Sequence, residues 1–325
     1  MLKKAVITAA GLGTRLFPAT KILKKELFPI VDQDGLVKPI IQIIIEELVQ
    51  LGIEEICLVI QPEDETIFRH YFNEPLTKNF AEQVANKPKI IQETKKVLEL
   101  GHRIEYVTQE KQDGFGHAVY CVKDWVGNEP FLLLLGDHIY ISHTKTSCTQ
   151  QVIEVYNRYQ KSVSGVLRTP EELIYRFGTL GAKPIQNNSR VYAVTELKEK
   201  PTIDYARHHL RVLGLVENEY LCLFGQYILT PGIFDCLQYH IEHNLRERNE
   251  IQLTSSLEML RQQEGYYAYE TQGNRYDIGV PEGYVETITA LAEKSNLNKI
   301  RISNVEYRNN QAKRKNKFKT KNQKT

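Results

Sequence analysis

Two glycines stand two residues apart directly after the first apolar run of the chain, in the segment Ala10-Gly11-Leu12-Gly13-Thr14-Arg15. Because glycine has no side chain, backbone amides in such a loop approach phosphate oxygens closely. Arg15 follows at once, and its guanidinium fork suits a polyphosphate. The dinucleotide-binding fingerprint would need a third glycine at Leu16, and a P-loop would need Gly-Lys-Ser/Thr. The segment therefore predicts a phosphate-binding loop of another kind, with a structural tight turn as the alternative.

The elements that would position this loop alternate along the first half of the chain, strand-like runs with helical patterns. Such alternation is typical of an α/β protein with crossover units on a mainly parallel sheet, and the helices should cover that sheet. After Asp137 strand-like runs predominate, which favours extension of the sheet by antiparallel strands. The strand-like runs are Lys4–Ala9, Ile56–Ile60, Ile104–Val107, Phe131–Leu135, Ser162–Arg168, Gly178–Lys183, Val191–Glu199 and Cys222–Leu229, and the helical ones are Pro39–Leu51 and Lys89–Leu100.

Composition places the chain among soluble globular proteins, since 42% of its 325 residues are hydrophobic and 25% are charged. No apolar run approaches the roughly 20 residues of a membrane-spanning helix, and no signal peptide is evident, so we expect a cytoplasmic protein without membrane insertion. Residues 308–325 hold 8 of the 42 basic residues and no acidic one, which leaves 34 minus 40, or −6, for residues 1–307. An acidic body with a basic tail predicts no specific nucleic-acid ligand, and we expect the tail to be disordered.

A longer motif follows the glycine loop: Phe17-Pro18-Ala19-Thr20-Lys21-Ile22-Leu23-Lys24-Lys25-Glu26-Leu27-Phe28-Pro29. Together with the loop, it resembles the opening signature of the nucleotidyltransferases that make sugar nucleotides, most closely the bacterial UTP:glucose-1-phosphate uridylyltransferases. Further segments are similar to motifs of that family in the same order, over about residues 3–290. They are Tyr106–Gln109, Gly114–Ala118, Leu135–Asp137, Glu199–Pro201, Phe224–Tyr227, Glu250–Thr254 and Asp277–Gly279.

The resemblance implies a nucleotidyltransferase fold, a Rossmann-like sheet flanked by helices, with residues 1–307 as the catalytic domain. It also implies a reaction in which a sugar 1-phosphate oxygen attacks the α-phosphorus of a nucleoside triphosphate. With UTP and glucose 1-phosphate as substrates, the products are UDP-glucose and pyrophosphate, and Mg²⁺ is the cofactor. Phosphoryl-type transfer depends on positioning and charge neutralisation, so the lack of a Ser-His-Asp triad is no objection. A homo-oligomer is compatible with the sequence.

The predicted catalytic residues are Arg15, Lys25 and Asp137. Asp137 follows an apolar strand, so it should lie at a strand's carboxyl end, where open α/β sheets bind ligands, and a carboxylate there suits magnesium. Asp277 matches the family's second magnesium ligand. Lys25 matches the signature lysine, a cation for the phosphates, although the neighbouring Lys24 could share that role. The alternatives are turn or capping carboxylates and a solvated lysine pair.

The nucleotide-binding prediction rests on Gln109, which matches the family's uracil-reading glutamine. A side-chain amide donates and accepts at once, as the edge of a pyrimidine requires. Ala10, Gly11, Gly13 and Gly114 should surround the nucleotide with backbone groups. A surface glutamine is the alternative for Gln109.

The sugar-phosphate prediction rests on Glu199 and Lys200, which match the family's sugar-site motif. A carboxylate accepts hydrogen bonds from sugar hydroxyls, and an ammonium beside it binds the sugar phosphate. Gly178 and Gly225 resemble glycines that let the backbone approach the sugar. A charged strand end over Lys198-Glu199-Lys200 is the alternative.

Two departures from the family pattern bear on substrate choice. Gln33–Val37 are about five residues more than the commonest family pattern, and their Asp-Gly pair predicts a tight turn. His138 follows Asp137 where close relatives carry an aliphatic residue. We expect His138 to be a packed or hydrogen-bonded neighbour rather than a metal ligand, because magnesium prefers oxygen.

Three other functions compete with uridylyl transfer to glucose 1-phosphate. A thymidylyltransferase, or a uridylyltransferase for another sugar 1-phosphate, would use the same scaffold, because uracil and thymine differ only by a methyl group. A non-catalytic homologue that binds nucleotide sugars should have lost a catalytic cation or carboxylate, yet Arg15, Lys25, Asp137 and Asp277 are all present. A nicotinamide-dependent oxidoreductase is disfavoured by the missing third glycine.

Overall fold

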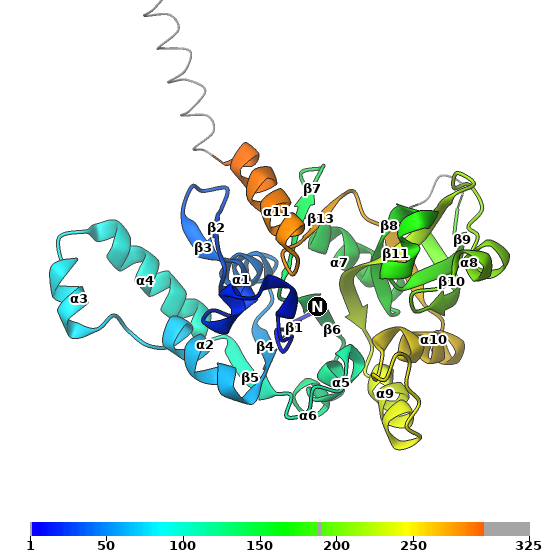
Figure 1. Cartoon of the computed structure of the whole chain (residues 1–325), viewed down its shortest axis with the longest axis horizontal. Coiled ribbons are helices and arrows are strands. Elements are labelled where there is room, and N and C mark those ends of the chain that lie inside the picture. Colours follow the sequence, from blue (N-terminus) through cyan, green and yellow to red (C-terminus); the bar gives the residue numbers. More distant parts are fainter. Residues whose placement is uncertain (1, 187–189, 296–325) are drawn as a thin grey trace, which may run out of the picture.

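The structure is a computed structural model that describes residues 2–186 and 190–295, so the predicted tail at 308–325 lies outside the described residues. Figure 1 shows the arrangement of its strands and helices. The strands are β1 (Lys4–Thr8), β2 (Pro29–Val31), β3 (Val37–Pro39), β4 (Glu55–Ile60), β5 (Ile104–Thr108), β6 (Phe131–Leu135), β7 (His138–Ser142), β8 (Val163–Pro170), β9 (Thr179–Pro184), β10 (Val191–Lys198), β11 (Glu219–Leu229), β12 (Tyr267–Glu270) and β13 (Gly273–Asp277).

The central sheet runs in the order β5-β4-β1-β6-β11-β8-β12-β10-β9. Its first four strands are parallel, with Val6 of β1 opposite Cys57 on one side and Leu133 on the other. These strands read as apolar runs because both faces of the sheet are covered, and Ile56 to Ile60 are all fully buried. The predicted parallel half is therefore confirmed.

Beyond β6 the sheet continues in mainly antiparallel pairing, as predicted. β11 is antiparallel to both β6 and β8, and β10 is antiparallel to β9 and β12. The one exception among the described strands is β12, which the sequence analysis did not identify and which pairs parallel with β8. These strands extend the sheet beyond β6, on the side away from β4 and β5.

The helices are α1 (Ile40–Gln50), α2 (Glu65–Phe72), α3 (Lys78–Gln83), α4 (Pro88–Gly101), α5 (Phe115–Tyr120), α6 (Lys123–Val126), α7 (Cys148–Tyr159), α8 (Ile203–His209), α9 (Gly232–Glu242), α10 (Leu253–Glu264) and α11 (Pro281–Lys294). α1 buries Ile40, Ile41, Ile44, Ile45 and Leu48 in the core. Over the described residues, no helix has both the length and the apolar character needed to cross a membrane.

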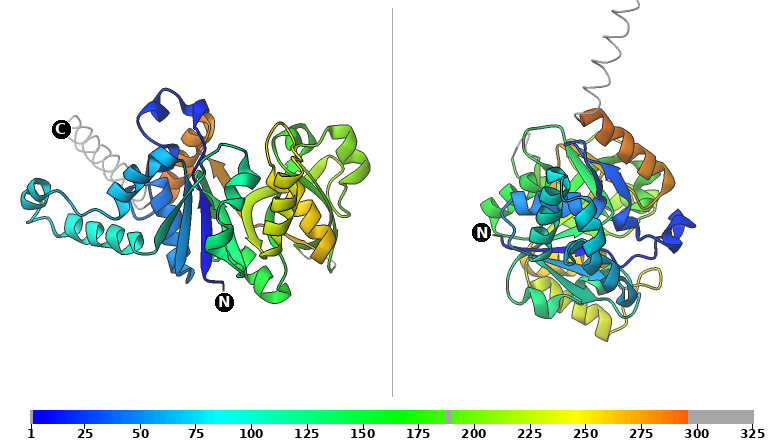
Figure 2. Two further views of the ribbon diagram at one scale, coloured as in Figure 1. Left: turned by 90° about the horizontal axis from the view of Figure 1, so that it is seen from below. Right: turned by 90° about the vertical axis from the view of Figure 1, so that its left-hand side faces the viewer.

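The helix α4 departs from its predicted role as a cover for the sheet. Only Leu100 and Gly101, in its last turn, are buried. Because α1 already covers the sheet, α4 packs against α1 and α2, and α3 and α4 extend outward from the body in Figures 1 and 2. The prediction for Lys89–Leu100 was therefore right about the helix and wrong about most of its packing.

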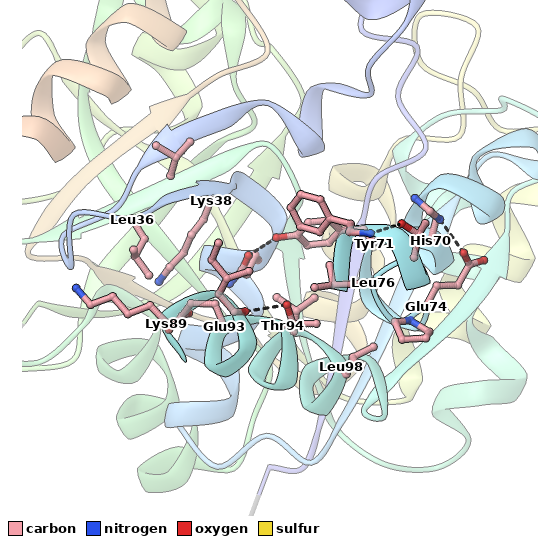
Figure 3. Close-up of a pocket in the computed structure, with 17 residues that line it drawn as sticks. Leu36, Lys38, His70, Tyr71, Glu74, Leu76, Lys89, Glu93, Thr94 and Leu98 are labelled. Carbon is pink, nitrogen blue, oxygen red and sulfur yellow. Dashed lines mark hydrogen bonds and ion pairs between the residues drawn. The ribbon is translucent and has the colours of Figure 1, made fainter. Parts of the chain in front are cut away.

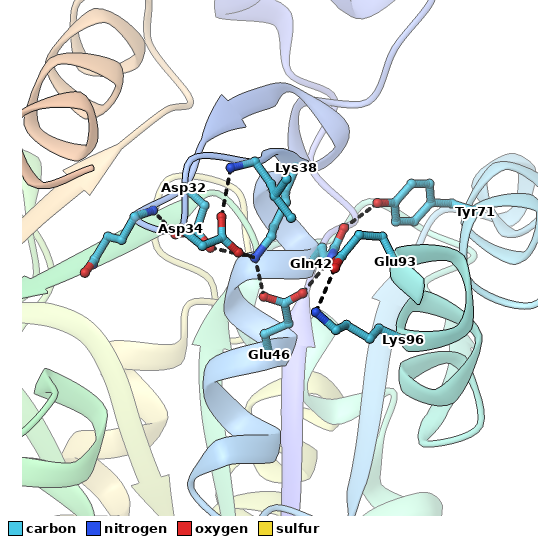
Figure 4. Close-up of polar contacts among 10 residues, drawn as sticks. Asp32, Asp34, Lys38, Gln42, Glu46, Tyr71, Glu93 and Lys96 are labelled. Carbon is cyan, nitrogen blue, oxygen red and sulfur yellow. Dashed lines mark hydrogen bonds and ion pairs between the residues drawn. The ribbon is translucent and has the colours of Figure 1, made fainter. Parts of the chain in front are cut away.

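The extra segment at Gln33–Val37 forms the tip of the β2–β3 hairpin, with the predicted tight turn. The Asp32 amide donates to the Leu36 carbonyl (2.8 Å), and Gly35 takes a φ of 88°. Lys38 fastens the hairpin to α1, since its ammonium lies 2.8 Å from a carboxylate oxygen of Asp32 and 2.7 Å from one of Glu46 (Figure 4). The exposed loop is thus tied to α1 through the buried side chain of Lys38, and its residues do not line the cavity around the glycine loop.

Candidate functional site

The glycine loop after β1 lines a cavity of about 500 Å³. Gly13 holds a φ of 65°, and the hydroxyl of Thr20 donates to its carbonyl oxygen (3.0 Å). A Cβ on Gly11 would lie 3.2 Å from Cε of Lys25, so the missing side chain lets Lys25 reach the loop. The predicted residues that line this cavity are Ala10, Gly11, Gly13, Arg15, Lys25, Gln109, Gly114 and Asp137.

Lys25 lies between two carboxylates. Its Nζ is 2.6 Å from Oδ2 of Asp137 and 2.7 Å from Oε1 of Glu26, and its side chain is only 11% exposed. Burial alone would lower the pKa of Lys25, but the two carboxylates outweigh burial and raise that pKa. The ammonium is therefore firmly charged and held at the cavity wall.

The two partner carboxylates respond differently to the same ammonium. Burial works to raise the pKa of Asp137, but the charge of Lys25 prevails and lowers it to about 2. Glu26 is fully buried, and desolvation raises the pKa of its carboxyl despite Lys25. Asp137 is thus the more firmly ionised of the two, which suits a group that binds cations.

Asp277 reaches the same region from a separate two-stranded sheet. β13 pairs antiparallel with β7, so that Asp277 lies opposite His138. A Cβ on Gly279 would lie 2.9 Å from Oδ2 of Asp137, 2.9 Å from Oδ1 of Asp277 and 3.1 Å from Nη2 of Arg15. Since glycine carries no Cβ, the space where both carboxylates and the guanidinium converge stays open. Two hard oxygen donors around such a space fit a divalent cation.

Gln109 and Gly114 form the opposite wall of the cavity. Gln109 is buried, and its Nε2 lies 3.1 Å from both the Gly114 carbonyl oxygen and Nδ1 of His117. Burial lowers the pKa of His117, so that nitrogen accepts from the amide. Gly114 takes a φ of 104°, and a Cβ there would lie 2.7 Å from the carbonyl oxygen of Ile251, so a larger residue does not fit.

The predicted sugar-phosphate residues form a second group. The hydroxyl of Thr254 donates to Oε2 of Glu199 (2.6 Å), and Nζ of Lys200 lies 3.1 Å from Oε1. A Cβ on Gly178 would lie 3.3 Å from Oε2 of Glu199, so Gly178 belongs with them. These three predicted residues do not line the cavity around the glycine loop.

Gly225 lies next to Tyr140 and His138. Its carbonyl oxygen accepts a hydrogen bond from the hydroxyl of Tyr140 (2.9 Å). A Cβ on Gly225 would lie 2.8 Å from the hydroxyl oxygen of Tyr140. The same Cβ would be 3.6 Å from Nδ1 of His138. Gly225 therefore lies beside the residues around Asp137.

Several residues that build the site were not singled out from the sequence. Glu26, Gly279 and Thr254 each lie inside a motif quoted above, but their roles depend on contacts with residues far away in the chain. Lys24 pairs with Asp64 (2.8 Å) and donates to the Gly11 carbonyl (3.3 Å), so it holds the glycine loop in place. No local sequence signal indicates such partners.

A second hollow, of about 540 Å³, lies between the β2–β3 hairpin and helices α2 to α4 (Figure 3). Its lining includes Leu76, Val97 and Leu98 as well as Tyr71, whose hydroxyl bonds to Gln42. None of the predicted catalytic, nucleotide-binding, sugar-binding or metal-binding residues lines it. The predicted chemistry therefore does not involve this hollow.

The chain belongs to the nucleotidyl transferase family, whose sequence profile matches residues 4–294. Among curated proteins it is similar to UTP--glucose-1-phosphate uridylyltransferase 2 of Staphylococcus saprophyticus, with 38% identity over 90% of this chain and 93% of that one. It is also similar to the UTP--glucose-1-phosphate uridylyltransferase of Bacillus subtilis, with 37% identity over 90% of this chain and 91% of that one.

Solved structures point to the same relatives. A UDP-glucose pyrophosphorylase complexed with UDP-glucose has a TM-score of 0.71 and 30% identity, covering 90% of this chain and 100% of that one. The UTP-bound enzyme from Acinetobacter baumannii has a TM-score of 0.77 and 28% identity, covering 94% and 98%. The predicted fold class and family are thereby confirmed.

Proposed function

We propose that this protein transfers the uridylyl group of UTP to glucose 1-phosphate, forming UDP-glucose and pyrophosphate, and that residues 1–307 are its catalytic domain. The observation that carries the proposal is the cavity in which the glycine loop, Gln109, Lys25 and Asp137 meet. It combines donors for phosphates, an amide for a pyrimidine edge and a carboxylate for a cation. The similarity to uridylyltransferases over most of the chain supports the choice of substrates.

In this proposal the triphosphate lies along the glycine loop. Amides of Gly11 and Gly13 donate to phosphate oxygens, and Arg15, which is exposed at the cavity mouth, binds the pyrophosphate end. Lys25 already carries its charge in a fixed position, so it stabilises charge that develops on the α-phosphate without reorganisation. Gln109 and the backbone of Ala10 and Gly114 select the base.

Asp137 and Asp277 would hold Mg²⁺, which neutralises phosphate charge and orients the triphosphate when bound. The two carboxylates and the space left by Gly279 support this assignment. Glu199 would accept hydrogen bonds from sugar hydroxyls, and Lys200 would bind the sugar phosphate. Gly178 and Gly225 would allow close approach of the sugar.

The test is pyrophosphate release measured across a matrix of nucleoside triphosphates and sugar 1-phosphates with Mg²⁺. UTP with glucose 1-phosphate should give the largest kcat/KM, and Asp137→Asn should abolish turnover while thermal melting shows that the variant still folds. A larger value with dTTP or with another sugar 1-phosphate would replace the proposed substrates but keep the reaction class. Absence of turnover with every pair would indicate a non-catalytic nucleotide-sugar-binding protein.

A further inference from the structure

His138 has a buried ring nitrogen that forms no hydrogen bond within the described residues. The residue is 8% exposed, and its Nδ1 lacks a partner. Nδ1 lies 3.5 Å from Oδ1 of Asp137, and Nε2 lies 3.8 Å from Oδ1 of Asp277. Both distances exceed an ordinary hydrogen bond. A buried polar atom without a partner calls for an explanation. The packed or hydrogen-bonded role expected from the sequence does not provide one.

The three side chains are arranged as ligands of one cation would be. One donor atom from each of Asp137, His138 and Asp277 lies within 4.8 Å of the other two. Two ligands at about 2.1 Å from one ion are between about 3 and 4.2 Å apart, depending on the angle between them. A ring binds one ion through one nitrogen, so the two separations concern alternative donors: Nδ1 at 3.5 Å from Asp137, or Nε2 at 3.8 Å from Asp277. Either separation falls in that range, and the widest spacing in the set, up to 4.8 Å, needs a shift of only a few tenths of an ångström per donor.

The two oxygens of Asp137 face different partners. Oδ2 is taken by Lys25 at 2.6 Å, whereas Oδ1 is turned toward His138. The oxygen of Asp137 without an ammonium partner is therefore the one nearest the imidazole. Cross-strand pairing of His138 with Asp277 places the third donor on the same side of the β7–β13 sheet.

We propose that His138 is a third protein ligand of the cation site, and that it makes the site favour Mn²⁺ or Co²⁺ over Mg²⁺. This inference rests on the cation site of the proposed function. Imidazole nitrogen is a better donor for first-row transition ions than for magnesium, which prefers oxygen. A site with two carboxylates and one imidazole should therefore bind Mn²⁺ more tightly than a site with the carboxylates alone, while Mg²⁺ gains little.

The test measures metal binding, not turnover. Mn²⁺ binding to the full chain is titrated through the electron paramagnetic resonance signal of free Mn²⁺, and Mg²⁺ affinity is obtained by competition. Loss of a partner that merely orients a ligand typically costs 10- to 100-fold in metal affinity. His138→Leu should therefore weaken Mn²⁺ binding by at least about 10-fold and Mg²⁺ binding by less than about threefold. His102→Leu, at an exposed position on the body, should change neither affinity.

Electron spin echo envelope modulation of Mn²⁺ on the wild-type protein provides a readout that needs no variant. It should show coupling to a directly bound ¹⁴N, and His138→Gln should abolish that coupling. Mn²⁺ that binds without ¹⁴N coupling, or with equal affinity in His138→Leu, would overturn the role of His138 and leave the proposed function intact. If Asp137→Asn bound Mn²⁺ as the wild type does, the cation site itself would be misplaced, and that part of the proposed function would fail too.

Discussion

Replacing Lys25 by methionine removes the ammonium that two buried carboxylates share. Lys25 lies within 2.7 Å of both Glu26 and Asp137, and methionine fills nearly the same volume without the charge. We expect Lys25→Met to lower the free energy of unfolding at neutral pH. We also expect the loss to shrink as the pH falls.

The size of the loss follows from the pKa of Asp137. A fall of this pKa from the ordinary 3.8 to about 2 is worth roughly 2 kcal/mol of stabilisation for this carboxylate. Breaking a buried ion pair on one side typically costs about 3–5 kcal/mol, because the other charge stays buried without a partner. With Glu26 also affected, about 3 kcal/mol is a reasonable expectation for Lys25→Met.

The sign of the pH dependence differs between the two proteins. In the wild type the pKa of Asp137 is lowered, so its stabilisation is present above about pH 4 and is lost as the pH falls toward 2. In Lys25→Met burial is opposed only by the weaker influences of His138 and of backbone hydrogen bonds, so the pKa of both Asp137 and Glu26 should lie above the ordinary values. The folded variant then takes up protons as the pH falls, and its deficit should diminish between about pH 7 and pH 5.

The measurement is urea unfolding at several pH values, followed by the fluorescence of Trp125, the single tryptophan. Lys25→Arg keeps a cation and should retain most of the stability. Lys3→Met removes a lysine from an exposed pair with Glu54 and should cost less than about 1 kcal/mol. A deficit for Lys25→Met that is below about 1 kcal/mol, or that stays constant from pH 7 to pH 5, would refute the argument.

Three further predictions concern individual parts of the site. Gln109→Ala should reduce the preference for UTP over ATP by about 10-fold in kcat/KM, because an unmatched buried polar group costs about 1–3 kcal/mol; an unchanged preference would remove Gln109 from base selection. Gly279→Ala should weaken divalent-cation binding in a competition titration, because its methyl group would lie 2.9 Å from oxygens of both Asp137 and Asp277; equal affinity would show that the cation binds elsewhere. Glu199→Gln should raise the KM for glucose 1-phosphate far more than that for UTP, and equal effects on both would argue against a sugar role.

The parts of the site that follow a parallel strand could be predicted from the sequence. β1 delivers the glycine loop, and β6 delivers Asp137, because apolar runs identify buried strands and ligands gather at their carboxyl ends. The two strands are neighbours in parallel register, with Thr8 opposite Leu135. The carboxyl ends of β1 and β6 must therefore lie together. The local sequence pattern and the geometry of a parallel sheet are enough to predict that the glycine loop and Asp137 meet.

The packing of α4 and the contact of Gly225 with Tyr140 could not be predicted in this way. The apolar residues of α4 do lie on a helix, as predicted. The surface against which they pack depends on α1, because α1 already covers the sheet. Gly225 was grouped with Glu199 by motif alone. Its contact with Tyr140 depends on how β11 passes the start of β7, and no residue near Gly225 in the sequence encodes that approach.

Asp277 and His138 show why the proposed cation site is the hardest part to derive. His138 follows Asp137 in sequence, yet the chain turns between them: Asp137 comes two residues after the end of β6, and His138 begins β7. Both side chains still face one space, because β7 leaves the central sheet and pairs with β13, whose last residue is Asp277. That pairing joins two five-residue strands from distant parts of the chain. Its register decides whether Asp277 faces the cation space, since a slip by one residue would turn it to the opposite side. The amide of Ile278, which donates to the carbonyl of Asp137 (3.0 Å), fixes this register, and it does so through a backbone contact that no side-chain pattern records.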